Sequence, residues 1–232
     1  MLFDLRGRGR RRTVQAIYLS LAILMGGGLV LFGIGSNTSG GGILDAVVGD
    51  GSSGSSATET IDKRIEAQLK RTRATPRDPA AWAQLARLRY QRAGIDGIGA
   101  DDVTYTPKGK EKLRLAAAAW ERHLALDPKQ PNVRVAKLMV QTYAATGIDQ
   151  PTKAVQAMQI VTAAEKPPSS NLYAQLAQLA YQANDTRTGD LAAARAVELA
   201  DKDTRKLLRT ELQRIKTQAA TAAAGATTTA AG

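Results

Sequence analysis

Trp82–Gln91 reads WAQLARLRYQ and Tyr173–Gln182 reads YAQLAQLAYQ, so seven of the ten aligned positions are identical. Two unrelated amphipathic helices seldom agree this closely, which indicates an internal repeat. A weaker third copy lies between them and has Leu138 and Tyr143 at matching positions. A recurring helix therefore decides the fold.

Each copy is followed by a second, alanine-rich segment whose apolar residues have helical spacing. Helix pairs that recur along a chain are typical of an α-solenoid, in which each pair buries its apolar face against its neighbours. No convincing alternation of period two, the pattern of a half-buried strand, occurs in the chain. The sequence therefore predicts an all-α fold of about three helical pairs with flanking helices. The second segments are Leu113–Leu126, Thr152–Ala164 and Gly189–Ala200.

Large and small residues recur at set positions in these pairs. In the first helix, Trp82 is followed three and four positions later by Leu85 and Ala86; in the second, Ala116 is followed four positions later by Trp120. This pattern resembles the tetratricopeptide repeat (TPR) family over about Pro79–Ala200. The resemblance implies that small residues let paired helices approach closely and that large ones fill the space between pairs. The core that it implies comprises Trp82, Leu85, Ala86, Ala116, Trp120, Leu124, Leu138, Tyr143, Ala154, Met158, Tyr173, Leu176 and Ala177.

The chain departs from the family pattern in its first repeat. A long insert, Gly94–Lys112, separates the two helices, and His123 stands where the family has a small residue. These departures affect the register but leave the helix pairs intact. After the last pair, Asp203–Ala219 has the apolar spacing of a helix that closes a solenoid by covering its last apolar face.

Val14–Ile34 is a run of 21 residues without a formal charge, long enough as a helix to cross a hydrocarbon core of about 30 Å. Five arginines precede the run, and no Lys or Arg follows it until Lys63. This asymmetry predicts a signal-anchor, with the N-terminus in the cytoplasm and the C-terminal domain on the extracytoplasmic side of the cell membrane. A cleaved secretory signal is the alternative, although the run is long for one and lacks an A-x-A ending.

The same run also has a spacing that bears on contact between two copies of the chain. Ala22 and Gly26 have the small-xxx-small spacing that lets two spans pack closely, so a homo-oligomer through the span is one reading. The other is that glycine is simply common in membrane spans.

The expected organisation follows from these signals. It comprises a cytoplasmic basic segment (1–13), the transmembrane helix (14–34), a Gly/Ser-rich linker (35–57), a TPR-like helical domain (58–218) and a disordered Ala/Thr tail (219–232).

Composition argues against several kinds of chemistry. The net charge is +11, but beyond the N-terminal arginines the cations alternate with acids along the helices, so we expect no nucleic-acid partner. Cysteine is absent, and the single histidine, His123, is expected to be packed or capping. Asp96, Asp101 and Asp102 share the insert, but their spacing is not that of an EF-hand loop, and an ordinary solvated loop is the default. No phosphate-binding, G-x-S-x-G or H-E-x-x-H motif is present. We therefore expect no enzyme activity, no cofactor and no metal site.

A polar strip on the first helices is the remaining functional candidate. Its residues lie about one turn apart and present groups that can hydrogen-bond an extended peptide; a solvated helix face is the alternative. The predicted function is a membrane-anchored, non-enzymatic scaffold that binds a protein or peptide partner, and the resemblance implies envelope or translocon-associated assembly. The alternatives are a chaperone-like holdase for exported polypeptides and a cationic binder of anionic surface polymers. The strip comprises Gln84, Arg87, Gln91, Gln175, Gln178 and Gln182.

Overall fold

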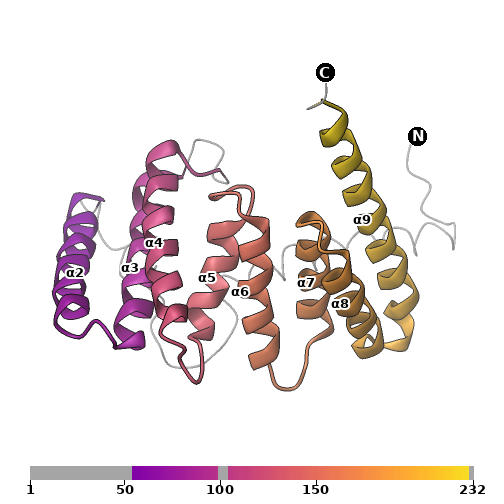
Figure 1. The fold of residues 1–232 in the computed structure, drawn as a ribbon, viewed down its shortest axis with the longest axis horizontal. Helices are drawn as coiled ribbons and strands as arrows, with labels where there is room; N and C mark the ends of the chain where they lie inside the picture. The colour runs from indigo at the N-terminus through magenta and orange to yellow at the C-terminus, as the bar shows by residue number, and fades with distance from the viewer. Residues whose placement is uncertain (1–53, 99–103, 230–232) are drawn as a thin grey trace, which may run out of the picture. The chain divides into compact units, whose positions relative to one another are not determined.

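The computed structural model describes residues 54–98 and 104–229, and the fold of this part is all-α (Figure 1). It contains eight helices and no strands, apart from an isolated bridge between Ile98 and Tyr105. The predicted all-α class is therefore confirmed for these residues. None of the helices described here combines the length and apolar character that a membrane crossing requires. The basic segment 1–13, the predicted span Val14–Ile34 and most of the linker lie outside the described residues.

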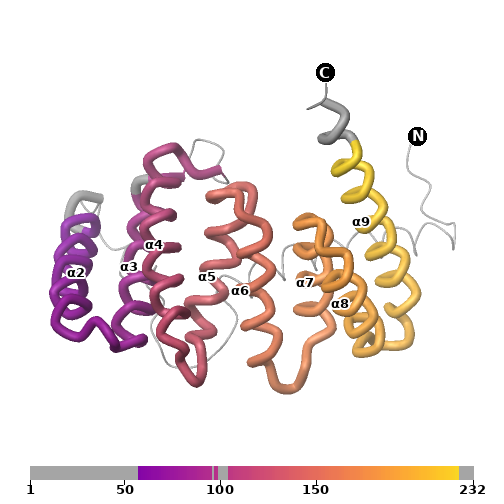
Figure 2. The backbone as a smooth tube through the Cα atoms, in the orientation of Figure 1, coloured from indigo at the N-terminus to yellow at the C-terminus, as the bar shows by residue number. Residues whose placement is uncertain are grey.

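Six of the described helices form three helical hairpins, traced as a tube in Figure 2. The hairpins contact one another in chain order: α5 contacts both helices of the first hairpin, and α7 contacts α6. Helix α2 (Gly54–Ala74) precedes the first hairpin, and α9 (Lys202–Thr229) packs against both helices of the last. The hairpins are α3 (Pro79–Gly97) with α4 (Pro107–Ala125), α5 (Val133–Tyr143) with α6 (Pro151–Ala164), and α7 (Ser170–Gln182) with α8 (Thr186–Leu199).

Side-chain caps set the starts of most of these helices. In each cap a side-chain oxygen accepts a hydrogen bond from a backbone N–H two or three residues further on, which stabilises a helix by about 1 kcal/mol. Proline occupies the first turn of α3, α4 and α6, where its missing N–H would have no helical partner. The capping residues are Asp78, Thr106, Asn132, Ser169 and Asp185.

The buried core runs through all three hairpins and is rich in alanine. Trp120 on α4 is 1% exposed and is its largest fully buried side chain. Four of the expected core residues, Trp82, Leu124, Leu138 and Tyr173, are only partly buried and pack against this cluster. The other nine lie within it: Leu85, Ala86, Ala116, Trp120, Tyr143, Ala154, Met158, Leu176 and Ala177.

The insert Gly94–Lys112 mostly continues the helices on either side of it. Helix α3 extends to Gly97 and α4 begins at Pro107, several residues before the expected start at Leu113. The two helices meet backbone to backbone here, because a Cβ on Gly97 would lie 2.4 Å from the Cα of Gly109. Asp101 and Asp102 lie outside the described residues.

Helix α9 is longer than the sequence predicts. The expected closing helix, Asp203–Ala219, lies within it, but α9 continues to Thr229 through the range 219–229 that we expected to be disordered. Alanine has the highest helix propensity, and Ala219 still packs against the core. At the other end, α2 begins at Gly54, inside the expected linker 35–57.

Candidate functional site

The polar strip lies on two helices that do not touch each other. Gln84, Arg87 and Gln91 are partly exposed on α3. On α7, Gln175 is partly exposed, whereas Gln178 and Gln182 are exposed. The structure therefore brings together the three residues on each helix, but α3 and α7 make no contact with each other.

Arg87 is the one member of the strip with a buried polar atom that lacks a hydrogen-bond partner in the described part of the chain. Its Nε atom is shielded from solvent and donates to no acceptor there. A buried donor without an acceptor costs about 1–3 kcal/mol, and more when the group is charged. If the side chain turned outward, a carbonyl or carboxylate oxygen of a partner would reach Nε and recover that free energy.

Three tyrosines at matching positions of the repeat connect the first helix of each hairpin to a neighbouring helix by a hydrogen bond. Tyr90 donates its hydroxyl hydrogen to Gln141 on α5 (2.5 Å), and Tyr143 donates to Glu121 on α4 (3.3 Å). Tyr181 donates to Asp190 on α8 at 2.9 Å. Burial is the main cause that raises the pKa of all three hydroxyl groups. These tyrosines are structural contacts of the helix pairs.

Asp190 extends the third of these contacts to α9. Lys216 donates to both carboxylate oxygens of Asp190, each at 2.8 Å. The hydrogen bond from Lys216, with a further one from Tyr181, holds the pKa of Asp190 below its usual value. One carboxylate therefore joins α7, α8 and α9.

Both ring nitrogens of His123 contact backbone groups of the fold. The side chain is 3% exposed; its Nδ1 atom lies 2.8 Å from the carbonyl oxygen of Pro79, and its Nε2 atom accepts from the backbone N–H of Asn132 at 3.2 Å. The ring also stacks on Trp120, with 4.9 Å between the centroids. A neutral ring with its hydrogen on Nδ1 satisfies both hydrogen bonds. His123 is therefore a packed, bridging residue with no free nitrogen for chemistry.

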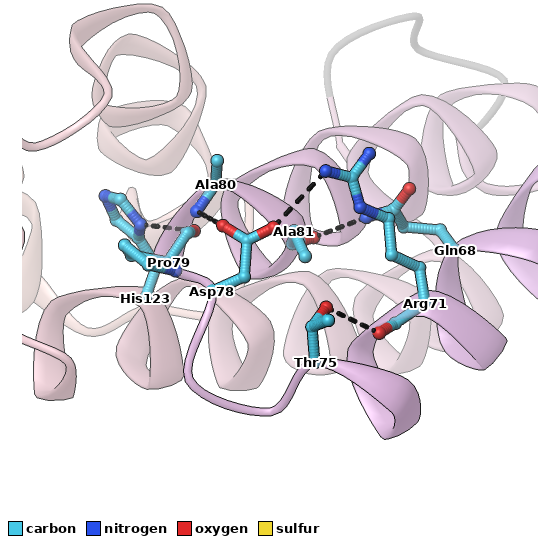
Figure 3. Close-up of polar contacts among 8 residues, drawn as sticks. All are labelled: Gln68, Arg71, Thr75, Asp78, Pro79, Ala80, Ala81 and His123. Carbon is cyan, nitrogen blue, oxygen red and sulfur yellow. Dashed lines mark hydrogen bonds and ion pairs between the residues drawn. The ribbon is translucent and has the colours of Figure 1, made fainter.

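The contact of α2 with α3 centres on the capping residue Asp78 (Figure 3). One carboxylate oxygen of Asp78 accepts from the backbone N–H of Ala80 (2.9 Å), and the other accepts from Arg71 on α2 (3.3 Å). Gln68 on α2 donates to the carbonyl oxygen of Ala81 at 2.8 Å. These polar contacts seat α2 at the start of α3.

A cleft of about 480 Å³ lies between α8 and α9. We call it the α8–α9 cleft. It was not predicted from the sequence, because its two walls are separate helices. Within the described ranges, no group of three or more His, Asp or Glu residues is placed to hold a metal ion. The residues that define the cleft include Asp190, Ala193, Val197, Arg205, Arg209 and Leu212.

Comparison with protein-family models, curated proteins and solved structures finds no match for this chain. The functional proposals therefore rest on the chain's own repeats, contacts and exposed groups.

Proposed function

We propose that this chain is a non-enzymatic scaffold whose TPR-like helix pairs bind a polypeptide partner. In this proposal Val14–Ile34 anchors the protein in the cell membrane, and the helical domain lies on the extracytoplasmic side. Three hairpins in chain order, with α9 packed on the last, support a solenoid arrangement. A role in envelope or translocon-associated assembly rests on the resemblance to the TPR family alone.

The unsatisfied Nε atom of Arg87 is the observation that carries the proposal. It lies on α3 between Gln84 and Gln91, which are one helical turn away on either side and partly exposed. Amide side chains that flank a guanidinium group can donate to and accept from the backbone of an extended chain. The strip on α3 therefore supports peptide recognition better than catalysis.

Site-specific photocrosslinking in native membranes tests this proposal. A photoreactive residue at Gln91 should capture one stoichiometric partner, whereas one at Gln159, exposed on α6, serves as the control. Arg87→Ala should abolish the product at position 91, while Arg122→Ala, a matched change at an exposed position of α4, should preserve it. Equal capture from positions 91 and 159, or a product that survives Arg87→Ala, would rule out the α3 strip as the binding surface.

The same experiment separates the scaffold from a holdase. A scaffold yields one partner, whereas a holdase yields many products from position 91 and suppresses the aggregation of unfolded exported chains.

Protease added to intact spheroplasts tests on which side of the membrane the helical domain lies. The helical domain should be degraded while a cytoplasmic marker survives, and protection of the domain would place it on the other side of the membrane.

A further inference from the structure

The α8–α9 cleft has an excess of available positive charge. Its two carboxylates already have cationic partners, because Asp190 is bound by Lys216 and Glu198 pairs with Arg195 at 2.7 Å. Arg209, by contrast, makes no hydrogen bond or ion pair with any described residue. Both acids that line the cleft therefore have cationic partners, whereas the guanidinium group of Arg209 has no acidic partner among the described residues.

Arg205 adds a second guanidinium group to the same wall. Its Nη2 atom donates to the carbonyl oxygens of Glu198 and Ala200 at 3.2 and 3.0 Å, which fixes the side chain at the end of α8. Its Nε atom is buried and has no hydrogen-bond partner among the described residues. A guanidinium group held in place in this way is preorganised to bind a carboxylate.

The residues of α9 that line the cleft are all cationic or neutral. They form a row at intervals of three or four, the spacing that places side chains on one face of a helix. The two carboxylates of α9, Asp203 and Glu211, fall outside this row. The row comprises Arg205, Arg209, Leu212 and Gln213.

Between the charged groups the lining of the cleft is apolar and provides the space. Ala193 and Ala194 on α8 are too short to fill the gap to α9, and Val197 and Leu212 line the same gap. An occupant that matches this wall carries an apolar side chain beside its negative charge.

We propose that the α8–α9 cleft binds an acidic peptide segment of a partner protein. Its carboxylates bind the guanidinium groups of Arg205 and Arg209, and an adjacent apolar side chain packs against Val197 and Leu212. This site rests on the proposed role in binding polypeptides but lies away from the α3 strip, since α3 contacts neither α8 nor α9.

Fluorescence anisotropy with the full chain in mild detergent at low salt tests this site. The probe is a fluorescein-labelled peptide of sequence DELLEDL, compared with its amide form NQLLQNL and with inorganic polyphosphate. The acidic peptide should bind best, because only it combines carboxylates with leucine side chains. No binding of DELLEDL, or equal binding of the amide peptide or of polyphosphate, would overturn the proposal.

Two kinds of variant locate the binding, and circular dichroism checks that each is folded. Arg209→Glu should weaken binding about tenfold, the effect of about 1.4 kcal/mol for reversing one available charge. Its control, Arg134→Glu, makes the same change of net charge at an exposed position of α5. Ala194→Phe should fill the cleft and weaken binding, whereas Ala163→Phe, at an exposed position of α6, should not.

Equal loss in a variant and its control would overturn the proposal, as would unchanged binding in Arg209→Glu. Failure of the α3 strip is a separate outcome, because it is read from the crosslink at position 91 and its dependence on Arg87.

Discussion

Replacing His123 with alanine should be among the most destabilising changes in this chain. The change leaves the carbonyl oxygen of Pro79 and the backbone N–H of Asn132 without their partner and removes the ring stacked on Trp120. Each lost hydrogen bond is worth about 1 kcal/mol. The cavity left by a large buried ring adds about 2 kcal/mol. We therefore expect the free energy of unfolding to fall by roughly 3–5 kcal/mol.

Urea unfolding of the full chain, followed by far-ultraviolet circular dichroism, measures this loss. Two further variants separate the contributions of the two hydrogen bonds to this loss. His123→Asn keeps a donor near the position of Nδ1, and His123→Gln keeps an acceptor near the position of Nε2. Each should lose less stability than His123→Ala, and the exposed neighbour Arg122→Ala should be nearly neutral. A loss below about 1 kcal/mol for His123→Ala would refute the bridging role of this side chain.

Three further predictions concern the tyrosine contacts and can use the same unfolding assay. Tyr181→Phe should lower the free energy of unfolding by about 1 kcal/mol, because it removes only the hydrogen bond to Asp190, which keeps Lys216; an unchanged midpoint would contradict this. Gly189→Ala should destabilise the fold by about 1–3 kcal/mol, since its Cβ would lie 2.4 Å from Tyr181 Cε1, and no loss would show that the ring moves freely. Stability should also fall as the pH rises above about 10, because burial raises the pKa of Tyr90, Tyr143 and Tyr181 and unfolded tyrosines therefore lose their protons first. Replacing all three with phenylalanine should flatten this decline, and an equally steep decline would exclude the tyrosines as its cause.

Where the repeat is strong, local sequence signals predict the order of the helices correctly. The spacing around Trp82 and Tyr173 predicted α3 and α7, and the alanine-rich segments predicted their partners. The early start of α4 has a local cause, because Thr106 caps the helix and Pro107 occupies its first turn. The extension of α9 differs from the expected disordered tail, because a run of alanine favours helix even where its composition is of low complexity.

The repeat and the apolar spacing are local properties of the chain, and the sequence alone determined them. Only the tertiary structure decided which residues on other helices the side chains of the repeat contact. Tyr90, Tyr143 and Tyr181 occupy matching positions, yet their hydroxyl groups contact different residues on different helices. The α8–α9 cleft likewise exists only because α9 packs against α7 and α8. Periodicity along a helix shows which face is buried, but which faces meet depends on how separate helices pack together.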